Sequence, residues 1–100
     1  MYITIGNSDD KLSQSQWADY QCKLLEIVDE FQKQIHGIWY SAPRSPYQNM
    51  CVCVEVDDTD GLVKALRGLC RDFNQDSIAL YHGSVTLVGD ADDNLPGENS

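Results

Sequence analysis

The run from Met50 to Val56 constrains the fold of this chain more than any other stretch. It alternates valine with thiol or carboxylate side chains, as Val52, Val54 and Val56 against Cys51, Cys53 and Glu55. Side chains of a strand point to opposite faces in turn, so one face of this run is all valine. A valine face belongs in a hydrophobic core. The run therefore predicts a strand in a sheet whose second face carries the two thiols.

A shorter β-rich run, Ile38 to Ser41, precedes this strand, and the segment from Ser41 to Asn49 connects the two. The connection holds Pro43 and Pro46, and proline lacks the N–H that a helix or a sheet ladder needs. The stretch from His36 to Asp58 therefore predicts two strands joined by a loop. The loop is longer than the usual hairpin connection of about two to five residues, which favours a functional role.

A long helix is predicted before this stretch, from about Gln14 to Gln34. Ser13 and Gln16 form the S-x-x-Q pattern of a capping box, and Gly37 is the expected C-cap. The apolar residues recur every three or four positions and form one stripe, which consists of Trp17, Tyr20, Leu24, Ile27, Val28, Phe31 and Ile35. Cys22 falls nearly opposite the stripe, so we expect it to be exposed.

A second helix is predicted from about Asp60 to Phe73, with Leu62, Leu66, Leu69 and Phe73 on its buried side. Asp57 and Asp58 precede it, where carboxylates cap a helix and favour its positive end. Two further strands are predicted at Tyr2 to Ile5 and Ser77 to Tyr81. His82-Gly83 is a two-residue turn signal, and Val85 to Val88 is the expected last strand.

The resulting order is strand, helix, strand, strand, helix, strand. It predicts an α+β fold of the ferredoxin-like βαββαβ type, with an antiparallel sheet, two helices on one face and a small C-terminal hairpin. The expected spatial order of the strands is 4-1-3-2. The chain of 100 residues predicts one domain, residues 1–88, followed by an acidic tail, residues 89–100, that we expect to be disordered.

The net charge is −9, from sixteen acids against seven Lys and Arg. Such a chain repels phosphate backbones, so we expect no direct binding of nucleic acid and favour a partner protein with a basic surface. No apolar run approaches the roughly 20 residues of a membrane helix, and the N-terminus has no signal-peptide pattern. We therefore expect no membrane association, a cytoplasmic location and reduced thiols.

In this fold, the loops at one edge of the sheet bring polar residues together. The predicted ligand- or partner-binding residues at this edge are Asn7, Ser8, Asp9, Asp10, Arg44, Gln48, Asn49, Arg71, Gln75, Asp76 and Ser77. Amide, hydroxyl and guanidinium groups can bind a small polar ligand or a partner's backbone. The alternative is that they only cap helices and turns. The opposite edge collects His36, Asp57, Asp58, Asp60 and His82.

The sheet face turned away from the helices is expected to show Tyr2, Trp39, Cys51, Cys53 and Tyr81, with Thr4 and Glu55. This face is too apolar to be exposed to water as one patch. We therefore predict that it pairs with a second copy of the chain, as a possible homodimer.

The sequence contains only weak patterns for metal binding and catalysis. Cys51 and Cys53 with His36 or His82 could bind zinc, but structural zinc sites usually use C-x₂₋₄-C turns. The cluster from Asp57 to Asp60 resembles the start of a calcium loop but lacks the glutamate at its end. No nucleophile–base pair and no phosphate-binding glycine loop is implied by spacing. We expect no metal, no cofactor, no catalytic residue and no enzyme activity.

The segments GNSDDKLSQSQW, HGIWYSAPRSPYQNMCVCVE and QDSIALYHG resemble a small family of bacterial and phage proteins. The resemblance spans the body up to about Val88 and implies neither an activity nor catalytic residues. In size and acidity the chain is also similar to phage inhibitors of bacterial defence, such as anti-CRISPR proteins. This second likeness is one of composition.

Together these observations predict a non-enzymatic acidic binding protein that inhibits or regulates a partner protein, as phage anti-defence inhibitors do. The partner's basic groove is expected to meet the tail acids and five acids of the body, Asp9, Asp10, Asp19, Asp29 and Glu30. The alternative is a protein that binds a small molecule, for example a nucleotide signal, at the polar loop edge.

Overall fold

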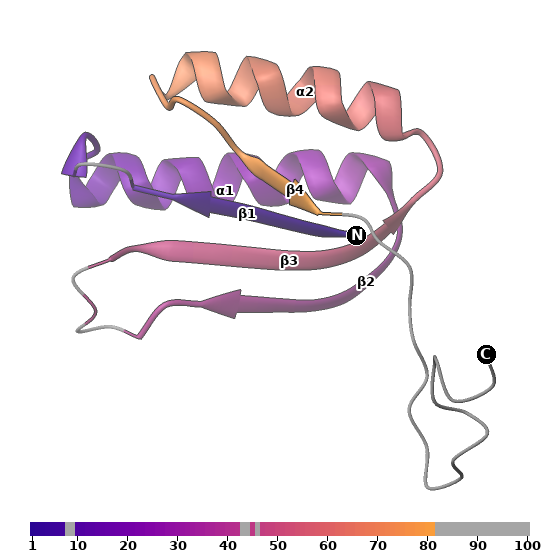
Figure 1. Ribbon diagram of the computed structural model, residues 1–100, viewed down its shortest axis with the longest axis horizontal. Coiled ribbons are helices and arrows are strands. Elements are labelled where there is room, and N and C mark those ends of the chain that lie inside the picture. Colours follow the sequence, from indigo (N-terminus) through magenta and orange to yellow (C-terminus); the bar gives the residue numbers. More distant parts are fainter. Residues whose placement is uncertain (8–9, 43–44, 46, 82–100) are drawn as a thin grey trace, which may run out of the picture.

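The computed structural model describes residues 1–7, 10–42, 45 and 47–81. These residues form the elements β1 (Tyr2–Gly6), α1 (Gln14–Phe31), β2 (Gln32–Tyr40), β3 (Asn49–Val56), α2 (Thr59–Asp72) and β4 (Ala79–Tyr81), in that order (Figure 1). Among them, neither helix has the length and apolar character needed to cross a membrane. The predicted turn at His82-Gly83, the strand from Val85 to Val88 and the tail, residues 89–100, lie outside the described residues.

The strands form one antiparallel sheet with the order β2-β3-β1-β4, as Figure 1 shows. Read from the other edge, this is the predicted order 4-1-3-2. The pairs Ile3–Val52 and Ile3–Leu80 fix the register of the central strands, because they place inward-facing residues opposite one another. The predicted α+β class, with a four-stranded antiparallel sheet and two helices, is confirmed.

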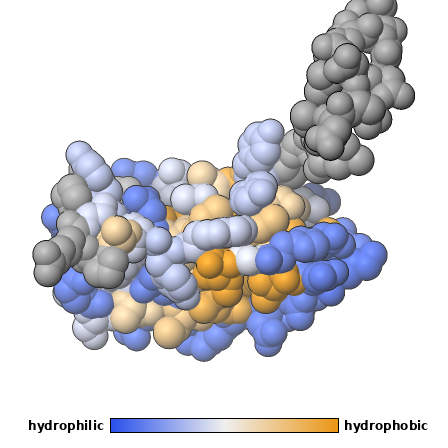
Figure 2. Space-filling view, turned by 90° about the horizontal axis from the view of Figure 1, so that it is seen from below, coloured by the Kyte–Doolittle hydropathy of each residue, from blue (hydrophilic) through white to orange (hydrophobic). Residues whose placement is uncertain are grey.

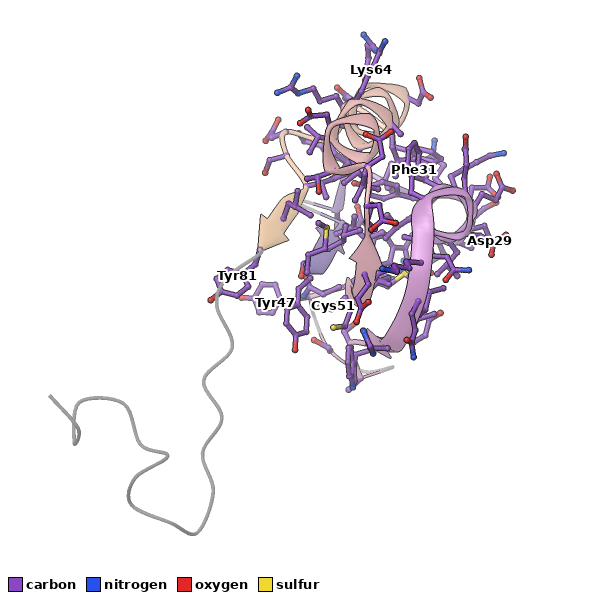
Figure 3. All side chains as sticks on the ribbon, turned by 90° about the vertical axis from the view of Figure 1, so that its right-hand side faces the viewer. Asp29, Phe31, Tyr47, Cys51, Lys64 and Tyr81 are labelled. Atoms are coloured by element: carbon purple, nitrogen blue, oxygen red, sulfur yellow. The ribbon has the colours of Figure 1, made fainter. Side chains whose placement is uncertain are left out.

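The core lies between one face of the sheet and both helices. The sheet contributes Ile3, Ile5, Met50, Val52 and Val54, α1 contributes Trp17, Tyr20, Leu24 and Val28, α2 contributes Leu62, Leu66 and Leu69, and Leu12 precedes α1. Each of these side chains is at least nine-tenths buried. The view in Figure 3 shows both helices on one side of the sheet, and no other described element covers the opposite face. The prediction that the valines of β3 face the helices is confirmed.

The end of α1 differs from the prediction. The helix stops at Phe31 and the chain enters β2 at once, so Ile35 and Gly37 belong to a strand instead of a last helical turn and its C-cap. Ile35 is four residues after Phe31, which mimics helical spacing, but it pairs with Val54 of β3. The long ladder between β2 and β3 outweighs one further turn of helix, because tertiary pairing overrides local propensity. The short predicted strand, Ile38 to Ser41, was therefore only the end of β2.

The ends of α2 agree with the prediction to within one residue. The Asp58 carboxylate accepts a hydrogen bond from the Gly61 backbone N–H at 2.9 Å and so caps the first turn. After the helix, Asn74 has φ 53, and the Gln75 N–H donates to the Cys70 carbonyl oxygen at 2.9 Å. A left-handed residue followed by this long backward bond is the Schellman ending. It turns the chain sharply back toward β4.

Candidate functional site

The uncovered sheet face is lined by aromatic rings and two thiols. Cross-strand pairing places Cys53 opposite Tyr2 and Cys51 opposite Trp39. The Tyr2 ring is 6.4 Å from the Trp39 ring on one side and 6.4 Å from the Tyr81 ring on the other, measured between centroids. The rings thus form a row across β2, β1 and β4. Figure 3 shows Cys51 and Tyr81 on the side of the sheet away from the helices, as the sequence predicts.

These side chains remain open to solvent in the single chain. The exposed fractions are 44% for Tyr2, 53% for Trp39 and 65% for Tyr81, while Cys51 and Cys53 are half-buried between them. Trp39 lies over Gly37 of the same strand, where an added Cβ would be 2.7 Å from the indole ring. Glycine at this position therefore leaves room for the indole ring.

Further apolar side chains of β2 are exposed on the helix side of the sheet. Ile35, Ile38 and Tyr40 pair with core-facing residues of β3 and are more than a third exposed, because α1 does not cover this edge strand completely. Figure 2 views the molecule from below, on the side of β2 and β3, and shows hydrophobic residues across the middle with hydrophilic residues around them. We refer to the uncovered face, with Tyr2, Trp39, Cys51, Cys53 and Tyr81, as the outer face.

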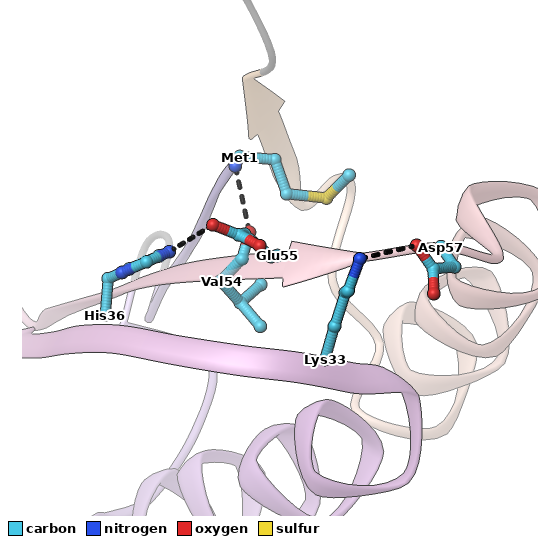
Figure 4. A network of polar contacts seen from close by, with 6 residues as sticks. All are labelled: Met1, Lys33, His36, Val54, Glu55 and Asp57. Carbon is cyan, nitrogen blue, oxygen red and sulfur yellow. Dashed lines mark hydrogen bonds and ion pairs between the residues drawn. The ribbon is translucent and has the colours of Figure 1, made fainter.

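Charges on the outer face are confined to one end, near the irregular part of β2. The β2–β3 register shifts between Gln32 and Gln34 and again between Ile35 and Gly37, so Lys33 and His36 have no paired residue on β3. The His36 Nε2 lies 2.9 Å from a Glu55 carboxylate oxygen, and the Lys33 Nζ lies 3.9 Å from Asp57 (Figure 4). Each acid at this end thus has a basic neighbour.

This arrangement corrects the prediction for the opposite edge. His36 is in the middle of β2 and contacts Glu55, so it does not join the aspartates at the start of α2. Asp57 contacts Lys33, and Asp58 caps α2. His82 lies outside the described residues. Within the described part of the chain, no three His, Cys, Asp or Glu side chains are grouped so as to hold a metal ion.

The thiols interact with a phenol on the outer face. A hydrogen bond with the Cys53 side chain, followed by the charge of the Cys53 thiolate, raises the pKa of Tyr2. The Tyr2 hydroxyl is therefore neutral at physiological pH. Among the described residues, no serine or cysteine side chain is hydrogen-bonded to a histidine, the contact that would activate such a side chain as a nucleophile.

At the predicted polar edge, the structure brings Asn7 and Gln48 together. The Asn7 side-chain amide donates to the Gln48 side-chain oxygen at 2.8 Å and to the Leu12 carbonyl at 3.0 Å, and the Leu12 N–H donates back to Asn7 Oδ1 at 2.9 Å. Gln48 also donates to the Gln14 side chain at 2.8 Å. Asn7 is buried and fully engaged, so it holds the β1–α1 connection in place and has no free group for a ligand.

The other residues of the polar edge are placed apart from this pair. Gln75 is buried and donates to the Phe73 carbonyl oxygen, while Asp76 contacts Lys11 at 3.3 Å. Asp10 is exposed with φ 51, and Arg71 is exposed on α2. Ser8, Asp9 and Arg44 lie outside the described residues. The edge therefore contains caps and turns at Asn7 and Gln75, whereas Asp76 and Ser77 belong to a groove between α2 and β4.

One cavity lies where the loop between β2 and β3 meets α1. It has a volume of about 280 Å³ and is lined mainly by polar residues, among them Gln14, Gln21, Ser41, Gln48 and Asn49. Of these, only Gln48 and Asn49 were predicted as site residues. Gln14 and Gln21 are on the exposed side of a helix whose apolar stripe was the main signal, and nothing local in the sequence indicates that the loop reaches them.

The acids of α1 collect on the side of the helix that faces solvent. Asp19, Glu26 and Glu30 are spaced by seven and four residues, which places them on one stripe, and Asp29 lies beside it. Within this group Glu26 contacts Lys23 at 3.3 Å. Figure 3 shows Asp29 on the far side of the molecule from Cys51. The acidic helix surface and the outer face are thus presented in different directions.

Comparisons of this chain with protein-family models, with curated proteins and with solved structures find no match in any of the three.

Proposed function

We propose that the protein is a non-enzymatic binding protein that works as a homodimer through the outer face. The observation that carries the proposal is the row of exposed rings over Cys51 and Cys53 in a chain of net charge −9. The central part of a protein interface is poor in charged residues and rich in aromatic ones. A face whose centre carries no charge also lets two strongly acidic copies approach each other with less repulsion.

The dimensions of the sheet fit such an interface. The four strands together hold 25 residues, and at about 3.3 Å along and about 4.8 Å between strands they give a footprint of about 400 Å² for each copy. Two copies bury about 800 Å², the size of a weak, transient contact, so we expect dissociation in the micromolar range. Packing about a two-fold axis would leave the helices of both copies facing outward.

The acidic surface of α1 is the proposed contact for a partner protein, whose activity the dimer would inhibit or regulate. Asp19, Asp29 and Glu30 have no cation in contact among the described residues, and a basic partner surface would supply one. The fold that we propose for this module is the ferredoxin-like βαββαβ arrangement. The order of the elements, the antiparallel pairing and the packing of both helices on one sheet face support it.

Sedimentation of two matched variants tests the dimer. Cys53→Asp places a charge in the middle of the outer face, and Cys22→Asp places the same charge on the exposed side of α1. We expect wild type and Cys22→Asp to sediment as dimers at about 50 µM and Cys53→Asp as a monomer, because an unpaired buried charge costs several kcal/mol. Circular dichroism checks that both variants are folded. A monomeric wild type at this concentration contradicts the proposal.

The partner contact is tested by capture from host lysate with wild type and with the variant Asp19→Asn, Asp29→Asn, Glu30→Gln. A partner that uses the α1 surface is captured by wild type, is lost with the neutral variant, and is released as the salt concentration rises. A captured protein that binds both forms equally does not use this surface.

A second candidate function rests on the polar cavity beside the β2–β3 loop. Its amide and hydroxyl lining, with Gln21, Gln48 and Asn49, suits a small polar ligand such as a nucleotide. Thermal unfolding with a panel of nucleotides tests it, with Gln21→Leu as the variant and Gln16→Leu, whose side chain closes the α1 capping box, as a control for helix stability. The candidate requires a rise in melting temperature that Gln21→Leu abolishes.

A further inference from the structure

The strand β4 forms the edge of the sheet on the side of α2. It pairs with β1 on one side, and no other strand of the described residues pairs with it. Its Leu80 is half-buried toward the helices, while Ala79 and Tyr81 are exposed. An edge strand presents N–H and C=O groups that can pair with an added strand. The edge therefore has hydrogen-bonding capacity that the described fold does not use.

An apolar groove runs beside this edge, between α2 and β4. It has a volume of about 310 Å³, and its walls include Val63, Leu66, Ile78 and Leu80. Cys70 also lines it, and burial, followed by the nearby charge of Asp76, raises the pKa of the Cys70 thiol. The thiol is thus neutral and contributes to an apolar wall. The groove can accept apolar side chains from a segment that lies along β4.

The cations of α2 form a stripe above this groove. Lys64, Arg67 and Arg71 are spaced by three and four residues and are exposed, and Arg67 lines the groove itself. Figure 3 shows Lys64 pointing away from the body of the molecule. Within the described residues none of the three forms an ion pair, whereas Lys11, Lys23 and Lys33 each do.

The acids near this stripe leave its positive charge in place. Asp60 is one turn before Lys64, in the first turn of α2, where the helix dipole favours it. Asp72 directly follows Arg71 but lies about 100° further round the helix, on the side that faces Lys23 and Phe73. Asp76 lines the groove but contacts Lys11 at 3.3 Å, which offsets its charge. The other edge strand, β2, has no comparable stripe, because its Lys33 contacts Asp57.

We propose that the groove between α2 and β4 binds an extended acidic segment of a partner protein, which adds a strand to the open edge of β4. Only alternate side chains of the added strand face α2, and among these the apolar ones enter the groove while the carboxylates bind Arg67 and Arg71. This goes beyond the proposed function, because the site lies on another surface and selects a partner segment of opposite charge to the one that fits α1. Strand addition is favoured over a small ligand, because only an extended backbone satisfies the groups of the edge.

The test uses the full chain and a fluorescent ten-residue peptide in which valine and aspartate take turns at every second position, with threonine between them, so that valine and aspartate share one face of the added strand. We expect saturable binding by fluorescence anisotropy at micromolar to submillimolar concentrations. The variant Arg67→Glu should weaken it by about tenfold or more, since it replaces a charge-assisted bond with repulsion. The matched control is Lys23→Glu, the same charge change on α1, which should alter the affinity less than about twofold.

Two further peptides separate strand addition from charge attraction. A peptide with the same side chains and N-methylated alternate amides should lose binding, because it cannot pair with β4. A peptide with lysine in place of each aspartate should not bind. Arg67 and Lys23 are both exposed, and thermal unfolding checks that the two variants are folded.

Several outcomes overturn the proposal. These are no binding of the valine–aspartate peptide at about 1 mM, equal binding to both charge variants, and equal binding of the N-methylated peptide. Binding that appears only when Asp90, Asp92 and Asp93 are changed to asparagine, or when Val85→Pro blocks the strand predicted at Val85 to Val88, assigns the edge and the groove to the chain's own C-terminal segment instead of a partner.

Discussion

Tyr20 has a buried hydroxyl group that makes no hydrogen bond within the described part of the chain. Its ring is fully buried, stacked 4.9 Å from the Phe73 ring and edge-on to Trp17 at 5.9 Å. No described residue lies within hydrogen-bond reach of its hydroxyl. Tyr20→Phe keeps the ring contacts and removes an unsatisfied polar group, so the free energy of unfolding should stay unchanged or rise by up to about 1 kcal/mol. Urea unfolding measures it, and a loss above about 1 kcal/mol would show that the hydroxyl has a partner after all.

The same residue predicts a loss of stability in alkali. Burial, followed by the charge of Cys70, raises the pKa of the Tyr20 phenol above its ordinary value of 10.0. Tyr20 therefore contributes fully to the free energy of unfolding below pH about 10, the pKa of the phenol in the unfolded chain. This contribution is lost as the pH rises further, because the phenol then ionises in the unfolded chain before it does so in the folded one. Between about pH 9.5 and pH 11, the unfolding free energy of wild type should fall more steeply than that of Tyr20→Phe. Parallel pH profiles would contradict this assignment.

Residue-level features that depend on near neighbours could be predicted from the sequence. The Ser13–Gln16 capping box is present as expected, with the Ser13 N–H donating to the Gln16 side chain at 2.8 Å. Cys22 is exposed, as its place opposite the apolar stripe indicates. The role of Gly37 beneath Trp39 was missed, because a glycine two residues after a long apolar stripe also fits a helix end.

Among the elements, α2 contains two glycines in opposite situations. A Cβ at Gly61 would collide with the Asp58 carboxylate and lie 2.9 Å from the Phe31 ring. At Gly68 the nearest atom to an added Cβ is a guanidinium nitrogen of Arg71 at 3.7 Å. Gly68→Ala should therefore stabilise the protein by about 0.5–1 kcal/mol, through the better helix propensity of alanine. Gly61→Ala should destabilise it by about 1–3 kcal/mol, through overpacking at the helix cap.

Denaturant unfolding of the two variants measures this difference within a single helix. The two substitutions are chemically identical, so propensity alone predicts the same sign for both. Stabilisation by Gly61→Ala would mean that the contact of Asp58 and Phe31 with the start of α2 is looser than the structure shows.

The boundary between α1 and β2 shows why element ends could not all be predicted. Phe31 and Ile35 have helical spacing, yet Ile35 also faces the helices from a strand that pairs with β3. The sequence around Ile35 is compatible with a helix and with a strand. The pairing with β3, about twenty positions later in the chain, selects the strand. For the same reason His36 was expected near Asp58, whereas the irregular ladder places it beside Glu55.

For the whole molecule, the class of fold and the two faces of the sheet followed from periodicity, because each strand and helix carries its pattern locally. The candidate site could be predicted only in part. The outer face follows from alternation on β3, whereas the groove between α2 and β4 depends on how far a three-residue strand lies from a helix. The expectation that removal of Gly89 to Ser100 leaves stability unchanged concerns residues outside the described part of the chain, and it stays a prediction.

The charge of the whole molecule gives the last prediction, which concerns salt. Two copies of a chain with net charge −9 repel each other at long range, while the proposed contact between their outer faces is uncharged at its centre. Raising the salt concentration from about 50 mM to about 500 mM shortens the screening length from about 14 Å to about 4 Å, so it removes the repulsion without weakening the contact. The dimer should therefore dissociate less at high salt, as measured by sedimentation over a range of protein concentrations. An interface built from ion pairs between the acidic α1 surface of one copy and the basic α2 stripe of the other would respond in the opposite direction. Weaker dimerisation at high salt would thus place the contact on the helices and exclude the outer face.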